Sequence, residues 1–396
     1  MKMDSIHQQI QVAFRYPLHF TTGVFDDANP LLGRVIGEDA DRSPAPAVFV
    51  VDRGLLPGHP DIVAAIERYC EAHREVVALA APVLLVPGGE AVKNDWHHVA
   101  DIHRLIHRGA LCRHSYVIGV GGGAVLDVVG FAAATAHRGI RLIRIPTTVL
   151  SQDDSAVGVK NGINGYGKKN FLGTFATPWA VINDSSFLPT LHDRDWRGGI
   201  SEAIKAALIR DPDFFDFIER HAGALKARDL PVMEEVVRRS AVLHLAHIAQ
   251  GGDPFEQGSS RPLDYGHWSA HKLEALTDYR LRHGEAVGIG IALDTTYAQL
   301  TGALGEPEWR RVIDVLQAVG LAIYTPELSE HLDDPDDPRG VLSGLAEFRE
   351  HLGGELTILL LNGIGRSFDC HDIDTAMMIL SIEVLRRRSA ADTQRA

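Results

Sequence analysis

The sequence predicts an α/β domain over residues 1–190 and a mainly helical domain over residues 191–396. Two observations support this division. Up to about Thr190, short continuous apolar runs alternate with amphipathic stretches, whereas helical periodicity dominates from Leu191 onward. Apolar strands that alternate with helices are typical of a parallel sheet covered by helices on both faces. We therefore expect a Rossmann-like parallel sheet, followed by helices.

Each expected strand ends at a residue that interrupts its apolar run. The strands are Ala47–Val51, Val83–Val86, Tyr116–Val120 and Leu142–Ile145, and helices are expected between them at Ile62–Tyr69 and Val99–Ile106. The helices expected in the second half include Ile200–Ile209, Val232–Ala249, Ser269–Leu276 and Glu285–Leu300. Ligands of an open parallel sheet bind at the carboxyl ends of its strands. The residues at these ends are Asp52, Gly88–Glu90, Gly121–Gly123 and Thr147–Thr148.

Composition restricts the classes of partner. The 396 residues include 39 Lys and Arg against 52 Asp and Glu, which gives a formal net charge of −13. A chain this acidic does not attract nucleic acid or anionic lipid non-specifically, so any phosphate must meet a local basic cluster. The stretch Tyr116–Ala136 contains a glycine triplet and Asp127, which makes it a poor membrane helix. The three cysteines are odd in number and far apart, so they imply no disulfide framework and fit a reducing compartment. The N-terminal residues also lack the apolar stretch of a secretory signal, and we therefore expect a cytoplasmic protein.

The glycine triplet Gly121–Gly123 follows an expected strand and opens a helix that contains Asp127. Glycine lets the backbone approach a pyrophosphate, and a helix N-terminus favours negative charge. The spacing differs from the dinucleotide-binding pattern G-x-G-x-x-G. A tight strand-to-helix turn without a ligand therefore stays an open alternative.

Two groups of residues in the helical part are candidates for chemistry. Glu202 and Lys205 lie three residues apart on an otherwise apolar helix, either as a functional pair or as an ordinary ion pair. His267 and His271 are four residues apart, and His283 follows them. Imidazoles together with a carboxylate suit Zn²⁺. Because the chain holds 20 histidines, this spacing alone leaves a structural role open.

The segment VGVKNGINGYGKKN is rich in glycine and lysine and contains Lys160, Lys168, Lys169 and Asn170. Against the acidic background of the chain, its ammonium groups are suited to a phosphate. A solvated surface loop is equally compatible with the pattern.

Taken in order, these segments resemble the 3-dehydroquinate synthase-like family, the sugar phosphate cyclases. The similarity runs from about Val48 to Arg366 and is carried by GGGAVLDVVGFAAAT, RGIRLIRIPTTVLSQDDSAVGVK, KKNFLGTF, GGISEAIKAALI, YGHWSAHKLE and LRHGEAV. Several motifs in the family order are much more specific than any one of them. The resemblance implies the dehydroquinate synthase-like fold, in which a Rossmann-like domain precedes a helical, metal-binding domain.

The resemblance also implies the residues of the site. NAD would contact Asp52, Glu90, Lys93, Gly122, Gly123, Asp127, Thr147, Thr148, Lys169 and Thr190. A divalent metal, zinc or cobalt, would be held by Glu202, His267 and His283. Catalytic roles would fall to Asp154, Lys160, Lys205, Glu256 and His271, the last as a phosphate contact and proton shuttle that is not a ligand. Substrate contacts would come from Arg138, Asn170, Asp264 and His351.

The chemistry implied by the resemblance is that of a carbon–oxygen lyase. Such cyclases eliminate phosphate from a sugar phosphate and close a carbocycle by an intramolecular aldol step, and NAD is regenerated in every cycle. The partner would be a small sugar phosphate, with neither nucleic acid nor membrane involved. A homodimer is also implied, because Arg138 matches a family arginine that reaches into the neighbouring subunit.

The chain departs from 3-dehydroquinate synthases at the positions that hold the substrate carboxylate. The family lysine and arginine fall on Ala246 and Ser260, with Arg261 one residue further on, and the family asparagine falls on Asp264. A carboxylate loses ~1.5–3 kcal/mol for each missing hydrogen bond to a charged group. The segment EFREHLGGELTI, with His351, resembles cyclases that convert sedoheptulose 7-phosphate to valiolone-type products. We therefore expect sedoheptulose 7-phosphate as the substrate.

Three alternatives stay open. One is a 3-dehydroquinate synthase that acts on 3-deoxy-arabino-heptulosonate 7-phosphate. Another is a metal-dependent polyol dehydrogenase of the same fold, although these enzymes usually have a lysine where this chain has Phe131 and an aspartate ligand where it has Glu202. The third is a non-catalytic, NAD-binding regulatory protein.

Overall fold

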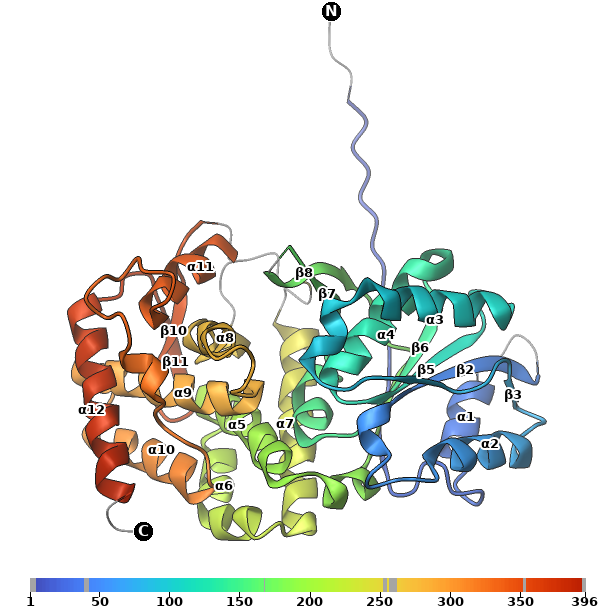
Figure 1. Cartoon of the computed structure of the whole chain (residues 1–396), viewed down its shortest axis with the longest axis horizontal. Helices are drawn as coiled ribbons and strands as arrows, with labels where there is room; N and C mark the ends of the chain where they lie inside the picture. Colours follow the sequence, from blue (N-terminus) through green and yellow to red (C-terminus); the bar gives the residue numbers. More distant parts are fainter. Residues whose placement is uncertain are drawn as a thin grey trace, which may run out of the picture.

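Figure 1 shows the computed structural model, which describes residues 5–38, 43–166, 168–251, 255, 262–351 and 354–393. We call residues 1–190 the sheet half and residues 191–396 the helical half. The main sheet consists of the parallel strands β1 (Leu18–Thr21), β2 (Ala45–Asp52), β3 (Val77–Leu79), β4 (Leu84–Val86), β5 (Tyr116–Gly121), β6 (Arg141–Pro146) and β9 (Ala180–Asp184). Their order is β1-β9-β6-β5-β2-β3, with β4 beside β2.

Helices cover both faces of this sheet, as the sequence predicts. Along β2, Phe49 and Val51 join the core under α1 (Leu31–Gly37) and α2 (Ile62–Ala72). Val48 and Val50 instead join the core under α3 (Trp96–Arg108) and α4 (Gly123–Thr135). Successive side chains of a strand point to opposite faces, so a strand buried on both faces is apolar throughout.

The glycine- and lysine-rich segment forms a β-hairpin, and its interpretation as a loop was wrong. Strands β7 (Lys160–Gly165) and β8 (Lys168–Phe175) pair antiparallel. Pairing satisfies the backbone polar groups of a segment whose side chains are mostly polar or absent. The side chain of Ile163 is buried in the core beneath α4, which attaches the hairpin to the sheet half. The hairpin lies between the two halves in Figure 1.

The helical half is built around one buried helix. Its helices are α5 (Asp193–Arg210), α6 (Pro212–Lys226), α7 (Leu230–Gln250), α8 (His267–Leu276), α9 (His283–Leu300), α10 (Glu306–Ala318), α11 (Gly344–His351) and α12 (Thr375–Thr393). Helix α9 is buried along most of its length and packs against α5, α8, α10 and α12. An antiparallel hairpin, β10 (Ile358–Gly363) and β11 (Arg366–Cys370), also packs on α9 and was not predicted.

Short single-turn helices connect these elements. They are η1 (Arg53–Leu55), η2 (Glu90–Asn94), η3 (Ala136–Arg138), the π-helical turn η4 (Ser151–Ser155), η5 (Ser185–Thr190), η6 (Pro262–Asp264), η7 (Pro326–Ser329) and η8 (Val341–Ser343). The change from the main sheet to helices falls between β9 and α5. The domain boundary at residue 190 stays a prediction. Within the described ranges, no helix combines the length and apolar character needed to span a membrane.

Candidate active site

Glu202 and His283 are brought together by a close crossing of α5 and α9. A Cβ on Gly284 would lie 2.0 Å from the carbonyl oxygen of Gly198, so the crossing requires glycine. Glu202 lies about one turn after Gly198, and His283 is the first residue of α9. The two glycines therefore place a carboxylate and an imidazole at the contact between the helices.

Glu202, His267 and His283 direct their ligand atoms toward one another. Oε1 of Glu202 is 3.6 Å from Nε2 of His267 and 3.4 Å from Nε2 of His283. Ligands of one tetrahedral zinc ion, with bonds of about 2.0–2.1 Å, lie roughly 3.3 Å apart. Oε1 is buried and has no hydrogen-bond partner among the described residues. Two imidazoles, a carboxylate and this unpartnered oxygen fit a divalent metal with an open coordination position.

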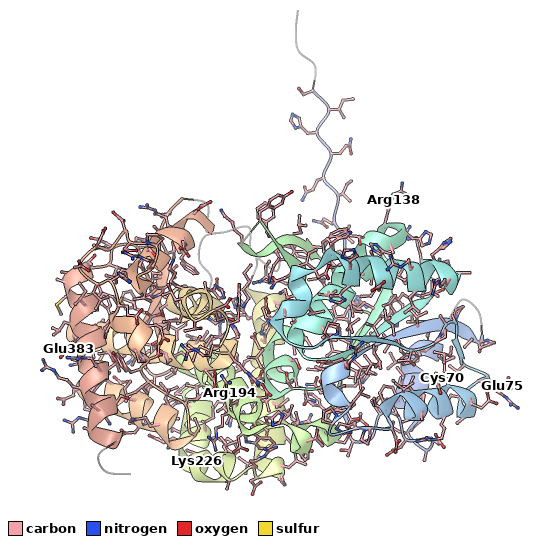
Figure 2. All side chains as sticks on the ribbon, in the orientation of Figure 1. Cys70, Glu75, Arg138, Arg194, Lys226 and Glu383 are labelled. Atoms are coloured by element: carbon pink, nitrogen blue, oxygen red, sulfur yellow. The ribbon has the colours of Figure 1, made fainter. Side chains whose placement is uncertain are left out.

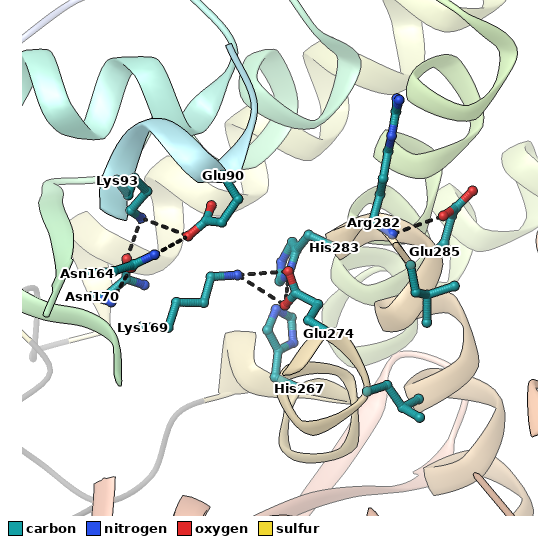
Figure 3. A network of polar contacts seen from close by, with 12 residues as sticks. Glu90, Lys93, Asn164, Lys169, Asn170, His267, Glu274, Arg282, His283 and Glu285 are labelled. Carbon is teal, nitrogen blue, oxygen red and sulfur yellow. Dashed lines mark hydrogen bonds and ion pairs between the residues drawn. The ribbon is translucent and has the colours of Figure 1, made fainter. Parts of the chain in front are cut away.

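Both histidines are oriented through their other ring nitrogen. Nδ1 of His267 is 3.0 Å from the carbonyl oxygen of Tyr265, and Nδ1 of His283 is 3.0 Å from Oε2 of Glu274. Such acceptors fix the ring and leave Nε2 for a metal. Glu274, which is labelled in Figure 3, was not predicted from the sequence. Its only signal is its position seven residues, or about two helical turns, after His267.

Buried opposite charges set the protonation states of this cluster. Burial alone would raise the pKa of Glu202, but Lys205 and His267 outweigh it and hold that pKa well below its ordinary value. Burial alone would lower the pKa of His283, but Glu274 and Glu202 raise that pKa to about 9. His283 is therefore protonated at neutral pH in the metal-free protein, and a metal must displace the proton from Nε2.

Lys205 links the metal cluster to Asp154. Its ammonium forms an ion pair with Glu202 and lies 3.8 Å from Oδ1 of Asp154. Burial would lower the pKa of Lys205, but Glu202 and Asp154 outweigh it and raise that pKa, and Asp264 adds a further negative charge. Asp154, in η4, accepts a 2.8 Å hydrogen bond from Nδ1 of His244 on α7. The sequence analysis also missed His244, whose sequence position carries no signal.

The residues at the carboxyl ends of β2, β5 and β6 lie together, as predicted. These residues are Asp52, Gly122, Gly123, Thr147 and Thr148. A Cβ on Gly122 would lie 3.5 Å from Cγ2 of Thr148, and one on Gly121 would lie 2.9 Å from Cβ of Asp52. The absence of side chains on these glycines lets the ends of β2, β5 and β6 approach one another closely at the start of α4. We call this group the strand-end cluster.

A second group beside the strand-end cluster surrounds Lys93. Its buried ammonium lies 2.7 Å from Oδ2 of Asp127 and 3.8 Å from Oε1 of Glu90, and it also donates to the side-chain oxygen of Asn170. Asn170, which was expected to contact substrate, therefore lies among residues that were expected to bind NAD (Figure 3). Lys169 points the other way, and its ammonium reaches Glu274.

Five of the predicted residues are exposed: Asn170, described above, Thr190 and the three that follow. Arg138 lies at the outer surface of the sheet half, and its side chain points outward (Figure 2). Lys160 is exposed at the start of β7. His271 is exposed on α8, and its ring centroid is 5.4 Å from that of His267 and 5.8 Å from that of His283. The roles expected for these residues stay predictions.

The remaining predicted residues are at the margin of the site or beyond the described part. The hydroxyl of Thr190 lies 3.0 Å from Nε2 of His59, beside the loop that follows β2. Glu256 and the side chain of His351 fall outside the described residues.

Comparisons with known proteins agree with this architecture. Family models of the N-terminal and C-terminal parts of 3-dehydroquinate synthase match residues 83–198 and 199–334. A 3-dehydroquinate synthase of Nitrosospira multiformis is 37% identical over 301 residues, which are 76% of this chain and 79% of that protein. One of Paracoccus denitrificans is 36% identical over 323 residues, or 80% of this chain and 86% of that protein.

Solved structures show the same relationship. A 2-epi-5-epi-valiolone synthase of Streptomyces hygroscopicus subsp. jinggangensis, with NAD⁺ and Zn²⁺ bound, has a TM-score of 0.84 at 27% identity and covers 97% of this chain and 100% of its own. A 2-deoxy-scyllo-inosose synthase, with a TM-score of 0.74 at 21% identity over 93% of this chain and 96% of its own, shares the fold. Sequence and fold together show that the chain belongs to the 3-dehydroquinate synthase family, a family of sugar phosphate cyclases.

Proposed function

We propose that the protein is a NAD- and metal-dependent sugar phosphate cyclase whose substrate is sedoheptulose 7-phosphate, a heptulose phosphate without a carboxylate. The charge around Lys205 carries the choice of substrate. Its ammonium faces the carboxylates of Glu202, Asp154 and Asp264. A bound divalent metal would offset the charge of Glu202, but Asp264, where the family has an asparagine, would still place a negative charge near a substrate carboxylate.

The nearby face of α7 supports the same substrate. The family position for a carboxylate-binding lysine is Ala246, which offers no charge. A hydroxymethyl terminus needs hydrogen-bond partners but no cationic one, and the carboxylate of Asp264 and the imidazole of His247 are suited to this role.

The site residues fit the two cofactors. Glu202, His267 and His283 would hold the divalent metal, and the strand-end cluster together with Glu90, Lys93, Asp127, Lys169 and Thr190 would hold NAD. The 2-epi-5-epi-valiolone synthase structure contains both NAD⁺ and Zn²⁺. When bound, NAD supplies a reversible hydride acceptor and the metal supplies a Lewis acid.

The side chains of this chain would carry out the remaining tasks. Lys205 and Lys160 would stabilise negative charge on the substrate oxygens and on the departing phosphate. Asp154, held in place by His244, would orient a substrate hydroxyl. His271 would move a proton beside the metal ligands. Glu256 matches the family residue for proton transfer.

A second candidate is a 3-dehydroquinate synthase that acts on 3-deoxy-arabino-heptulosonate 7-phosphate. The relatives named above carry that activity in their names. Arg210 also favours it, because its Nη2 lies 2.7 Å from Nδ1 of His247, which adjoins Ala246. A guanidinium near the missing family lysine is a potential carboxylate partner.

Steady-state kinetics on the two sugars decide between these functions. We expect sedoheptulose 7-phosphate to have the higher kcat/KM, with a cyclitol product identified by mass spectrometry and NMR. Arg210→Ala and Arg261→Ala should leave this preference intact. A higher kcat/KM for the carboxylated sugar, lost in either variant, would establish a 3-dehydroquinate synthase instead.

We also propose a homodimer in which Arg138 enters the neighbouring active site. The exposure of Arg138 at the outer surface of its own chain is compatible with this role. Mixing inactive Arg138→Ala subunits with inactive Lys205→Ala subunits should restore part of the activity. No recovery, despite demonstrated subunit exchange, would contradict a shared site. The cytoplasmic location stays a prediction from the sequence.

A further inference from the structure

One buried ion pair connects the two halves directly at the metal cluster. Nζ of Lys169, on the β7–β8 hairpin, lies 2.9 and 3.0 Å from the two carboxylate oxygens of Glu274 on α8. The side chain of Glu274 is 3% exposed and that of Lys169 is 22% exposed. Figure 3 shows Lys169 reaching across to Glu274 from the side of the Lys93 group.

Glu274 contacts a proposed metal ligand as well as Lys169. Its Oε2, one of the two oxygens that Lys169 contacts, also lies 3.0 Å from Nδ1 of His283. Nε2 of His283 in turn lies 3.4 Å from Glu202. The charge of Lys169 is therefore separated from a metal ligand by a single shared carboxylate.

We propose that the Lys169–Glu274 bridge couples NAD binding to metal binding, with Glu274 as the positioning residue for His283. This inference rests on the proposed function, which assigns NAD to the sheet half and the metal to Glu202, His267 and His283. Binding of either cofactor should raise the affinity for the other by the same factor.

The sign of the coupling follows from the charges. A carboxylate that accepts from Nδ1 raises the basicity of a metal-binding imidazole. Lys169 opposes this effect, because its ammonium draws on the same carboxylate and adds positive charge near the metal. The anionic pyrophosphate of NAD would share the charge of Lys169, and Glu274 would then interact more strongly with His283. Coupling between two sites is reciprocal by linkage.

Lys168 provides a matched control. It lies next to Lys169 on the same hairpin and also reaches the helical half, with Nζ 2.9 Å from Oε1 of Glu350. The two side chains of this pair are 60% and 72% exposed. An exposed ion pair of this kind is weak, and Glu350 lies on α11, which carries none of the three proposed metal ligands.

The test measures binding of Zn²⁺ and NAD⁺ without substrate. The Zn²⁺ dissociation constant of the metal-free protein is determined by competition with a chelator, with and without saturating NAD⁺. The NAD⁺ dissociation constant is determined with and without Zn²⁺. Each cofactor then has a coupling ratio, which is its dissociation constant without the other cofactor divided by that with it. In the wild type, the two coupling ratios should be equal and lie in the range of about 5 to 150 that is typical of coupled sites.

The variants identify the route of the coupling. Lys169→Met should bring both ratios close to one, Lys169→Arg should retain part of the coupling, and Lys168→Met should match the wild type. Glu274→Gln should weaken Zn²⁺ binding without NAD⁺ by about 10- to 100-fold. Full coupling in Lys169→Met, or wild-type Zn²⁺ affinity in Glu274→Gln, would overturn the inference.

The same measurements separate this inference from the proposed function. A wild-type protein that binds both Zn²⁺ and NAD⁺ but without coupling contradicts the bridge and leaves the cyclase assignment standing. A wild-type protein that binds neither contradicts both. Because the readout is affinity, the outcome does not depend on the identity of the sugar.

Discussion

The strand-end cluster and the metal cluster are assembled in opposite ways. The strand-end cluster takes short continuous segments, such as Gly122–Gly123 and Thr147–Thr148, from the ends of adjacent parallel strands. The metal cluster takes single side chains from α5, α8 and α9 and buries a carboxylate among them. Local sequence motifs therefore predict the strand-end cluster, whereas the metal cluster depends on how helices that are distant in the sequence pack together.

The two clusters also differ in their electrostatics. Around the metal cluster, Glu202 and Lys205 are almost fully buried, and each depends on the other for a counter-charge. At the strand ends, much of the site is made by glycines and threonines without charge. We therefore expect substitutions in the metal cluster to have the larger effects on stability.

The largest effect is expected for Glu202→Gln. In the metal-free protein, this change leaves the buried Lys205 with Asp154, at 3.8 Å, as its one carboxylate within ion-pair distance among the described residues, and breaking a buried pair costs about 3–5 kcal/mol. Zinc affinity should fall by more than about 100-fold, because a ligand is lost rather than an outer-shell contact. Urea unfolding and zinc content after dialysis measure the two effects.

Glu306→Gln is the control for this prediction. Glu306 forms an exposed ion pair with Arg310 on α10, so stability should change by no more than about 0.5 kcal/mol. Stoichiometric zinc retained by Glu202→Gln through dialysis would show that the metal is held elsewhere.

The strands of the sheet half were predictable to different degrees. β2, β4, β5 and β6 were predicted because continuous apolar runs end at a proline, a glycine or an aspartate. β3 and β9 were not predicted: β3 takes up only three residues of the apolar stretch Val76–Ala81, and β9 ends in the polar Asn183 and Asp184. The β7–β8 hairpin was not predicted because its sequence is too polar and glycine-rich to suggest a strand. It forms strands because β7 and β8 pair with each other and so satisfy their backbone hydrogen-bonding groups.

The metal cluster was predictable only through the order of motifs. The spacing of His267 and His271 suggests two ligands on one helix, but His271 is exposed and it is His283 that approaches Glu202 together with His267. Glu274, on α8, belongs to the site because its carboxylate orients the ring of His283 on α9. Contacts of this kind depend on tertiary packing, which residue spacing along one helix does not specify.

The stability of the folded protein is expected to depend on pH through Asp294, which contacts the neighbours of the proposed metal ligand His267. Asp294 on α9 accepts hydrogen bonds from the neighbours of His267: the backbone N–H of Gly266 at 3.0 Å and Nε1 of Trp268 at 2.8 Å. Burial raises the pKa of Asp294 from 3.8 to about 7. Between these values the unfolded chain alone has released its proton, so rising pH destabilises the folded protein.

Comparison with Asp294→Asn isolates this effect. The stability of the wild type relative to the variant should fall by roughly 1 kcal/mol per pH unit across that window and level off above it. Urea unfolding of both metal-free proteins at several pH values gives the difference. A difference that does not change with pH would mean that Asp294 ionises equally in both states.

The smallest of these effects is expected at the strand ends, for Gly121→Ala. The new Cβ would lie 2.9 Å from Cβ of Asp52 and 3.0 Å from Cγ1 of Val125, which pushes β2 and α4 away from the strand end. Overpacking of this kind costs about 1–3 kcal/mol. NAD⁺ affinity should fall by about tenfold, equivalent to ~1.4 kcal/mol, while Zn²⁺ affinity measured without NAD⁺ should stay unchanged.

Gly223→Ala on α6 serves as its control. A Cβ at that position meets nothing within 4 Å, so both affinities should stay at their wild-type values. An equal loss of Zn²⁺ affinity in Gly121→Ala would contradict the separation of the two clusters.

We propose above all that the two clusters serve one reaction without net oxidation. Purified protein supplied with zinc, substoichiometric NAD⁺ and excess sedoheptulose 7-phosphate tests it most directly. We predict that many equivalents of phosphate are released per NAD⁺, while the NADH absorbance shows no steady increase. Stoichiometric accumulation of NADH without phosphate release, in the presence of sufficient NAD⁺, would contradict the account and identify a dehydrogenase.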